Sequence, residues 1–284
     1  MGDVMKKAAW VVAVCAAMGL ILCGIAGAAE LSADAKTDGQ VKDLPQDGWR
    51  TLGALDRVKG NDIVQVQTLD AADGDVGLVY AMPKVKAVKA KVKLPLEAGG
   101  NGEEQEITSL FLGNAPVTGA TGQPVLPVVP CYVVLPEGQA YAGASVTTGN
   151  LVDLAGSYKV KHAQPAIPLL PDAKPKYVAP DPAVYGSDDP FPADTLGTVR
   201  VQKKRGVTIV IVNLNPVVYK PKSGKVSYYT SLKLDIQTKP AAPTTDGKMK
   251  VKYRPDKARP LSGQVDNPGA LAGYGAPSTK GGAK

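Results

Sequence analysis

The feature that most constrains this chain is a series of short, valine-rich segments that end at glycine or proline. Such segments recur between Ile63 and Gln237. β-Branched side chains in short runs bounded by turn residues are typical of strands. Glycine and proline together supply 31 + 24 = 55 of the 284 residues, which leaves no convincing amphipathic helix. We also find no repeat of about 20–50 residues. The pattern therefore predicts an all-β fold, an antiparallel β-sandwich of the jelly-roll or Ig-like kind.

The N-terminus has the pattern of a secretory signal. Lys6 and Lys7 precede an apolar run over residues 8–25, and Ala26-Gly27-Ala28 supplies the small residues of a cleavage site. We expect a signal peptide over residues 1–28, cleaved after Ala28, and a secreted product that is extracellular or periplasmic and has no membrane contact. An uncleaved anchor is the alternative, because the run is nearly long enough to span a bilayer.

Cysteine and histidine usage argues against an enzyme. Cleavage removes Cys15 and Cys23, so Cys131 is the one thiol left and no internal disulfide can form. Cys131 lies between pairs of valines, which is typical of a buried, inert thiol. His162 is the single histidine and lies in a lysine-rich segment. A thiolate nucleophile needs an exposed, electropositive site and a nearby base, so we assign no catalytic residue.

The search for cofactor and metal sites gives one weak candidate. One Cys and one His cannot supply the ligand set of zinc. The glycine-rich run 99–102 is followed by Glu103 and Glu104, which would repel a phosphate. Asp188 and Asp189 are weak calcium candidates, and a solvated acidic turn is the competing interpretation. We expect no cofactor and no bound metal.

Lysines alternate with Val, Ala or Leu from Lys84 to Leu96. Their parity changes after Lys86, which predicts a bulge or a break in a strand. A row of lysines is a known protection for an edge strand. Nucleic-acid binding is the alternative, but no aromatic side chain lies between these lysines to stack on bases. The net charge is +7, or +6 once Asp3, Lys6 and Lys7 are removed, and we expect no nucleic-acid partner.

Composition divides the rest of the chain. Residues 29–59 are predicted to be a flexible leader, 60–240 the sandwich, and 241–284 a Pro/Gly/Lys-rich linker or disordered tail. Residues 163–192 contain eight prolines, so we expect an extended connection that is neither a helix nor a central strand. Residues 207–214 and 226–237 form the clearest predicted pair of strands.

Three stretches resemble, in order and spacing, the propeptide of gingipain-type cysteine peptidases, and the match covers about residues 60–240. The first is 122–127 (GQPVLP) with 135–138 (LPEG). The second is 163–166 (AQPA) with 185–192 (YGSDDPFP). The third is 205–206 (RG), then 215–221 (NPVVYKP) and 228–230 (YYT).

The resemblance implies a β-sandwich propeptide that acts as a folding chaperone and latency inhibitor of a gingipain-type cysteine peptidase, in cis or in trans. In that family the catalytic domain follows the propeptide, so the chain is a fragment or a stand-alone module, and a full precursor would be a cysteine endopeptidase. The family's inhibitory loop presents a basic residue, which predicts that role for Lys174 or Lys176. Arg254 and Arg259 are candidate processing sites. The alternative function is a non-catalytic cell-surface or matrix-binding β-sandwich.

Overall fold

The computed structural model describes residues 50–51, 63–70, 74–93, 102–166, 176–242, 253 and 260–275. The predicted signal peptide, Ala28, Lys174, Arg254 and Arg259 lie outside these described residues. The predicted leader, residues 29–59, also lies outside the described residues, with the exception of Arg50 and Thr51.

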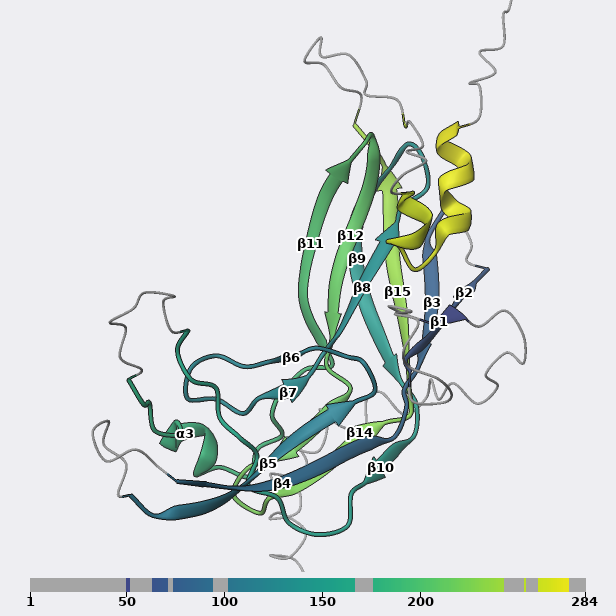
Figure 1. Ribbon diagram of the computed structural model, residues 1–284. Helices are drawn as coiled ribbons and strands as arrows, with labels where there is room; N and C mark the ends of the chain where they lie inside the picture. The colour runs from purple at the N-terminus through teal and green to yellow at the C-terminus, as the bar shows by residue number, and fades with distance from the viewer. Residues whose placement is uncertain are drawn as a thin grey trace, which may run out of the picture. The chain divides into compact units, whose positions relative to one another are not determined.

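Two antiparallel sheets face each other (Figure 1). The larger has the strand order β1-β2-β3-β15-β9, with the bounds Arg50–Thr51, Gln65–Leu69, Val76–Ala81, Ser231–Pro240 and Gln139–Thr148. The smaller has the order β11-β12-β8, with the bounds Leu196–Lys204, Val207–Leu214 and Val129–Val134. The predicted antiparallel β-sandwich is confirmed.

The core between the sheets follows from the two-residue period of a strand. Leu232, Leu234 and Ile236 on β15 are fully buried, and they share one cluster with Val210 and Val212 of β12 in the facing sheet. The alternate residues of β15 point away from this core, and two of them form an ion pair of 3.0 Å, Lys233 with Asp235. Alternation therefore sets which face each strand buries.

A group of smaller sheets continues the same buried cluster (Figure 1). One has the order β10-β14-β13, with the bounds Leu151–Asp153, Lys225–Tyr229 and Val217–Lys220. A second joins β4 (Val85–Lys93) to β5 (Glu104–Leu112), and a third joins β6 (Val117–Thr118) to β7 (Leu126–Pro127). No helix among the described residues is long and apolar enough to cross a membrane.

The predicted pairing of 207–214 with 226–237 is wrong. β12 pairs with β11 and β8, whereas the second segment is divided at Thr230 into β14 and β15, which belong to different sheets. At the division, Thr230 N donates to Asn150 O, outside both ladders. A period of two is the same in either sheet, so it cannot reveal where a chain changes sheets.

The predicted bulge among the lysines is also wrong. The register of β4 with β5 is unbroken from Val85↔Leu112 to Lys93↔Glu104. After Ala87, which is half-buried against the core, both faces of β4 are exposed. Neither face there requires apolar residues, so the change of parity has no structural consequence. The prediction of an edge strand is confirmed within the described residues, where β4 pairs with β5 alone.

The proline-rich stretch contains a short helix that the sequence analysis excluded. Helix α3 spans Pro182–Tyr185. Asp181 caps it, because its side chain accepts a bond of 2.9 Å from Ala183 N. Pro182 occupies the first turn, where its missing N–H costs nothing, so proline starts this helix and does not break it.

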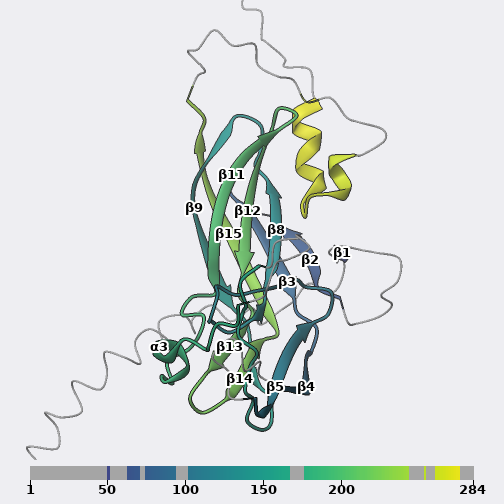
Figure 2. The same cartoon turned by 60° about the vertical axis from the view of Figure 1, so that its left-hand side comes forward.

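The tail prediction is wrong for residues 260–275. They form two 3-10 helices, η3 (Leu261–Gly263) and η4 (Pro268–Gly275), and Figure 2 shows both beside β8 and β12. Leu261, Val265 and Leu271 are buried against Val134, Val207 and Ile209 on the outer face of the smaller sheet. Because this segment covers the outer face of the smaller sheet, β8 has apolar residues on both of its faces. The few apolar residues of the segment are diluted by Gly, Ala and Pro, so composition alone masked their packing.

Candidate docking site at the base of the proline-rich loop

The proline-rich loop, residues 165–176, leaves and re-enters the fold at adjacent points. Gln164 at its start and Val178 just after its end are joined by two hydrogen bonds. Gln164 Nε2 donates to Val178 O, and Val178 N donates to Gln164 Oε1, each at 2.9 Å. The amide side chain thus reproduces the pairing of one residue in a β-ladder. Residues 167–175 lie outside the described residues, but both ends of the loop are held together.

His162 adds a contact to the hydrogen bonds between Gln164 and Val178, and we call these three residues the clasp. Its Nε2 lies 2.9 Å from Val178 O, and its ring meets the Tyr177 ring edge-on at 5.5 Å between centroids. A carbonyl can only accept, so the proton of the imidazole lies on Nε2. Burial, with a smaller contribution from Lys159 and Lys161, lowers the pKa of His162, while the bond to Val178 opposes that shift. The neutral imidazole therefore has a structural role as a donor.

Gly122 connects the first resembling stretch to the loop base. Its N–H donates to Ala163 O, and its carbonyl accepts from Asp181 N, both at 2.9 Å. The φ of Gly122 is +84°, and an added Cβ would lie 3.4 Å from Ala179 O. Only glycine adopts such a backbone without strain, so the residue type follows from this position.

Two tyrosines connect the second and third resembling stretches. Tyr185 Oη donates to Val160 O at 2.8 Å, and its ring meets the Tyr219 ring edge-on at 6.4 Å. Tyr219 exchanges two backbone bonds of 2.8 Å with Phe191, and its hydroxyl donates to Tyr158 O at 2.9 Å. Burial raises the pKa of both tyrosines, so both hydroxyls stay protonated and available as donors.

Parts of the three stretches therefore meet near the two ends of the loop, namely Gly122, Ala163 with Gln164, Tyr185 and Tyr219. The other pieces lie elsewhere: Leu135 bonds to Thr208 and Tyr274, and residues 205–206 form the turn between β11 and β12. Lys176 is exposed and directly precedes Tyr177, the residue whose ring rests on His162. Sequence reasoning missed Gln164 and Tyr177 as anchors. Gln164 lies within a quoted stretch and Tyr177 lies between two of them, but nothing in the sequence shows that an exposed glutamine bridges a gap of 14 residues.

The two calcium candidates belong to a hydrogen-bonded turn. Asp188 Oδ1 accepts from Ser223 N at 2.8 Å, and this bond lowers the pKa of Asp188. Asp189 Oδ2 accepts from Ser187 Oγ at 2.6 Å. Among the described residues, no group of three or more His, Cys, Asp or Glu side chains could hold a metal ion.

Cys131 and His162 are not partners in the described structure. Cys131 is fully buried in the core of the sandwich, and its Sγ contacts Val129 O at 3.5 Å. Burial, and to a lesser extent the charge of Asp266, raises the pKa of the thiol well above its ordinary range. This is the environment of an inert cysteine, as the sequence predicted.

Comparisons with known proteins give fold-level similarities. No protein-family model and no curated protein matches the chain. One similar solved structure comes from work on the zymogenic latency of gingipain K of Porphyromonas gingivalis, with 18% identity, a TM-score of 0.46 and coverage of 62% of this chain and 93% of that chain. Another is the complex of the pro- and mature domains of Porphyromonas gingivalis RgpB, with 18% identity, a TM-score of 0.48 and coverage of 65% and 89%.

Proposed function

We propose that the chain is a secreted, propeptide-like module that assists the folding of a gingipain-type cysteine peptidase domain and holds that domain inactive. The supporting observation is that parts of the three family-like stretches, around Gly122, Gln164 and Tyr185 with Tyr219, converge at the base of the proline-rich loop. A loop held at both ends loses little conformational entropy when it binds, which is how pre-organised inhibitors gain affinity.

A lysine of this loop would enter the specificity pocket of the peptidase. Lys176 lies beside the anchor formed by Tyr177 and His162. Lys174 precedes Pro175, which favours an extended backbone at the lysine. An acidic pocket would add a charge-assisted hydrogen bond to either amine. The inhibitory role is therefore assigned to Lys174 or Lys176.

The remaining parts of the proposal concern export and maturation. The signal peptide is removed after Ala28, the product acts outside the cytoplasm, and Arg254 or Arg259 is the processing site where a peptidase domain is joined in cis. The module itself performs no catalysis, which fits the burial of Cys131. The peptidase domain is accordingly the partner, in cis or in trans.

The test is inhibition in trans by the chain starting at Ala29. A purified gingipain-type peptidase is assayed with increasing amounts of wild type, Lys174→Ala, Lys176→Ala and the double variant. We expect inhibition by wild type, and an inhibition constant at least about tenfold higher for the double variant, since a buried charge-assisted bond is lost. Lys203→Ala with Lys239→Ala, both exposed strand lysines outside the loop base, is the matched control and should inhibit like wild type.

Two results would count against the proposal at different levels. If the double variant inhibits as well as wild type, neither Lys174 nor Lys176 fills the specificity pocket. The chain would still be an inhibitory module. If the chain neither inhibits nor forms a complex with a peptidase of this type, the proposed function itself is removed. The alternative, a matrix-binding sandwich, would then be favoured.

A further inference from the structure

Strand β4 presents an open edge. Within the described residues, its backbone pairs with β5 on one side only. The other side of β5 is already joined to the segment 159–161, because Thr108 N donates to Lys159 O at 2.7 Å and Lys161 N donates to Thr108 O at 2.8 Å. Figure 1 shows β4 and β5 as a long two-stranded ribbon. In an antiparallel pair every second residue directs its N–H and C=O away from the partner strand, and these outward groups of β4 can pair with an added strand.

The two faces of this edge differ sharply in chemistry. Lys89, Lys91 and Lys93 project from one face. Val88, Ala90 and Val92 project from the other, which also carries Lys86 near the start of the strand. On the apolar face Val88 is 52% exposed, and Phe111 of β5 is 45% exposed. β4 contains no acidic residue. A strand that pairs here would place its alternate side chains opposite lysines and opposite apolar groups.

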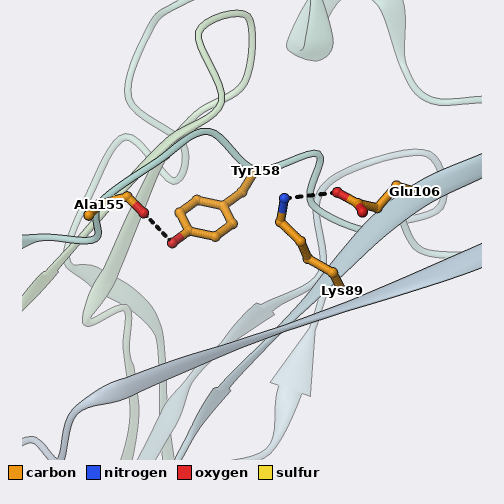
Figure 3. Close-up of polar contacts among 4 residues, drawn as sticks. All are labelled: Lys89, Glu106, Ala155 and Tyr158. Atoms are coloured by element: carbon orange, nitrogen blue, oxygen red, sulfur yellow. Dashed lines mark hydrogen bonds and ion pairs between the residues drawn. The ribbon is translucent and has the colours of Figure 1, made fainter.

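Lys89 is held by contacts within the ribbon and its surroundings. Its Nζ forms an ion pair of 2.8 Å with Glu106 and lies 6.0 Å from the centroid of the Tyr158 ring (Figure 3). Tyr158 is in turn fixed by a hydrogen bond of 2.6 Å from its hydroxyl to Ala155 O. Lys91 and Lys93 lie further along the same face and are exposed. Across the ribbon Lys91 lies opposite Glu106 and Lys93 opposite Glu104, so these two carboxylates flank the lysines on the side away from the open edge.

We propose that the open edge of β4 binds an extended segment of a partner protein in which acidic and apolar side chains alternate. Charge complementarity selects this occupant, because acidic side chains opposite Lys91 and Lys93 attract, whereas a second copy of β4 would set lysines against lysines. The apolar alternate positions would cover Val88 and Val92. This edge is formed by other residues than the proline-rich loop, so the inference does not rest on the proposed inhibition.

The test uses a synthetic peptide of nine alternating Glu and Val residues, matched to the length of β4. The peptide is acetylated, fluorescently labelled and titrated with the chain starting at Ala29. We expect saturable binding with new hydrogen-exchange protection over residues 85–93. Lys91→Gln with Lys93→Gln should weaken binding by about tenfold, because two attractive cross-strand pairs are lost while no like charge is set against Glu104 and Glu106. The same charge change on the edge strand β11, Arg200→Gln with Lys203→Gln, should alter binding by less than about twofold.

Two further probes identify what the edge recognises. The same peptide N-methylated at alternate residues cannot complete a ladder, so it should bind at least about tenfold more weakly than the unmodified peptide. Equal binding of the methylated peptide, or an equal loss of affinity in the β11 variant, would show attraction by net charge alone and would overturn the proposal. So would binding of a single-stranded oligonucleotide that depends on Lys91 and Lys93 while the peptide fails to bind.

Discussion

At the scale of single residues, Cys131 shows how the core of the sandwich shields a thiol. Its side chain is fully buried, and burial raises the pKa of its thiol. Only thiolates react rapidly, so labelling should require unfolding of the sandwich. In a preparation starting at Ala29, a thiol reagent at neutral pH should label Cys131 at least about a thousandfold more slowly than in denaturant. Rapid labelling accompanied by loss of a hydrolytic activity would contradict the non-catalytic account.

Asp266 is a second buried titratable residue, and it fastens the C-terminal segment. Its Oδ2 accepts from Tyr80 Oη at 2.9 Å and from Tyr132 N at 2.8 Å. Arg50 Nη1 donates to its backbone carbonyl at 3.3 Å. Burial nevertheless dominates and raises the pKa of Asp266 from 3.8 to about 6. The neighbouring Tyr80 and Cys131 have pKa values raised well above their ordinary ranges, so they stay uncharged in this interval.

The shift at Asp266 predicts a pH dependence of stability. A carboxyl whose pKa is higher in the folded chain contributes stability that is complete below about pH 4 and is lost as the pH rises through about 6. Wild type should therefore lose up to about 3 kcal/mol of unfolding free energy, relative to Asp266→Asn, between about pH 4 and about pH 8. Denaturant titrations of both chains across this interval measure the difference. His162 has a lowered pKa and the opposite slope, but it is common to both chains and cancels. A difference that does not change with pH would contradict the assignment.

At the scale of elements, the clasp should keep the proline-rich loop from opening. Gln164→Ala removes two hydrogen bonds to Val178. These bonds are exposed, so we expect a modest effect, with cleavage by trypsin after Lys176 about fivefold to tenfold faster. Lys174 precedes Pro175 and is a poor trypsin site, which leaves Lys176 as the reporter. Gln202→Ala, at an exposed position on β11, is the control and should be cleaved like wild type.

The C-terminal segment 260–275 covers the open edge of β8. Asn267 exchanges two hydrogen bonds of 2.8 Å with Val134, while Leu261 and Leu271 cover the adjoining face. A chain ending at Arg259 should therefore unfold at a temperature about 10 °C lower and should associate through the exposed edge. Calorimetry and size-exclusion chromatography report the two effects. A chain ending at Gly275 is the control and should behave as full length. Unchanged stability of the shorter chain would show that the segment adds nothing to the fold.

These elements also show what the sequence could and could not predict. The alternation of Leu232, Leu234 and Ile236 with polar residues identified a strand and its buried face, because that pattern is local. The partner of that strand was not predictable, since Thr230 marks a change of sheet that no local pattern signals. The packing of Leu271 was missed for a related reason. Its burial depends on the outer face of β8 and β12, which is distant in sequence.

At the scale of the whole molecule, the sequence stretches identified the region of the candidate site but not its construction. The pieces around Gly122, Tyr185 and Tyr219 were recognisable because their residue types follow from turns and tight contacts. Their mutual contacts arise from hydrogen bonds that join residues far apart in the chain, such as Tyr185 to Val160 and Gln164 to Val178. Only a folded chain reveals that these pieces meet at both ends of one loop.

The proposed function requires that this region blocks the active site of a cysteine peptidase. It is tested most directly by the rate at which a small covalent reagent labels the catalytic cysteine of a gingipain-type peptidase. With a saturating amount of the chain starting at Ala29, labelling should slow by at least about tenfold, and the double variant Lys174→Ala with Lys176→Ala should restore much of the rate. Labelling at the same rate with and without the chain, while the two proteins form a complex, would contradict the account.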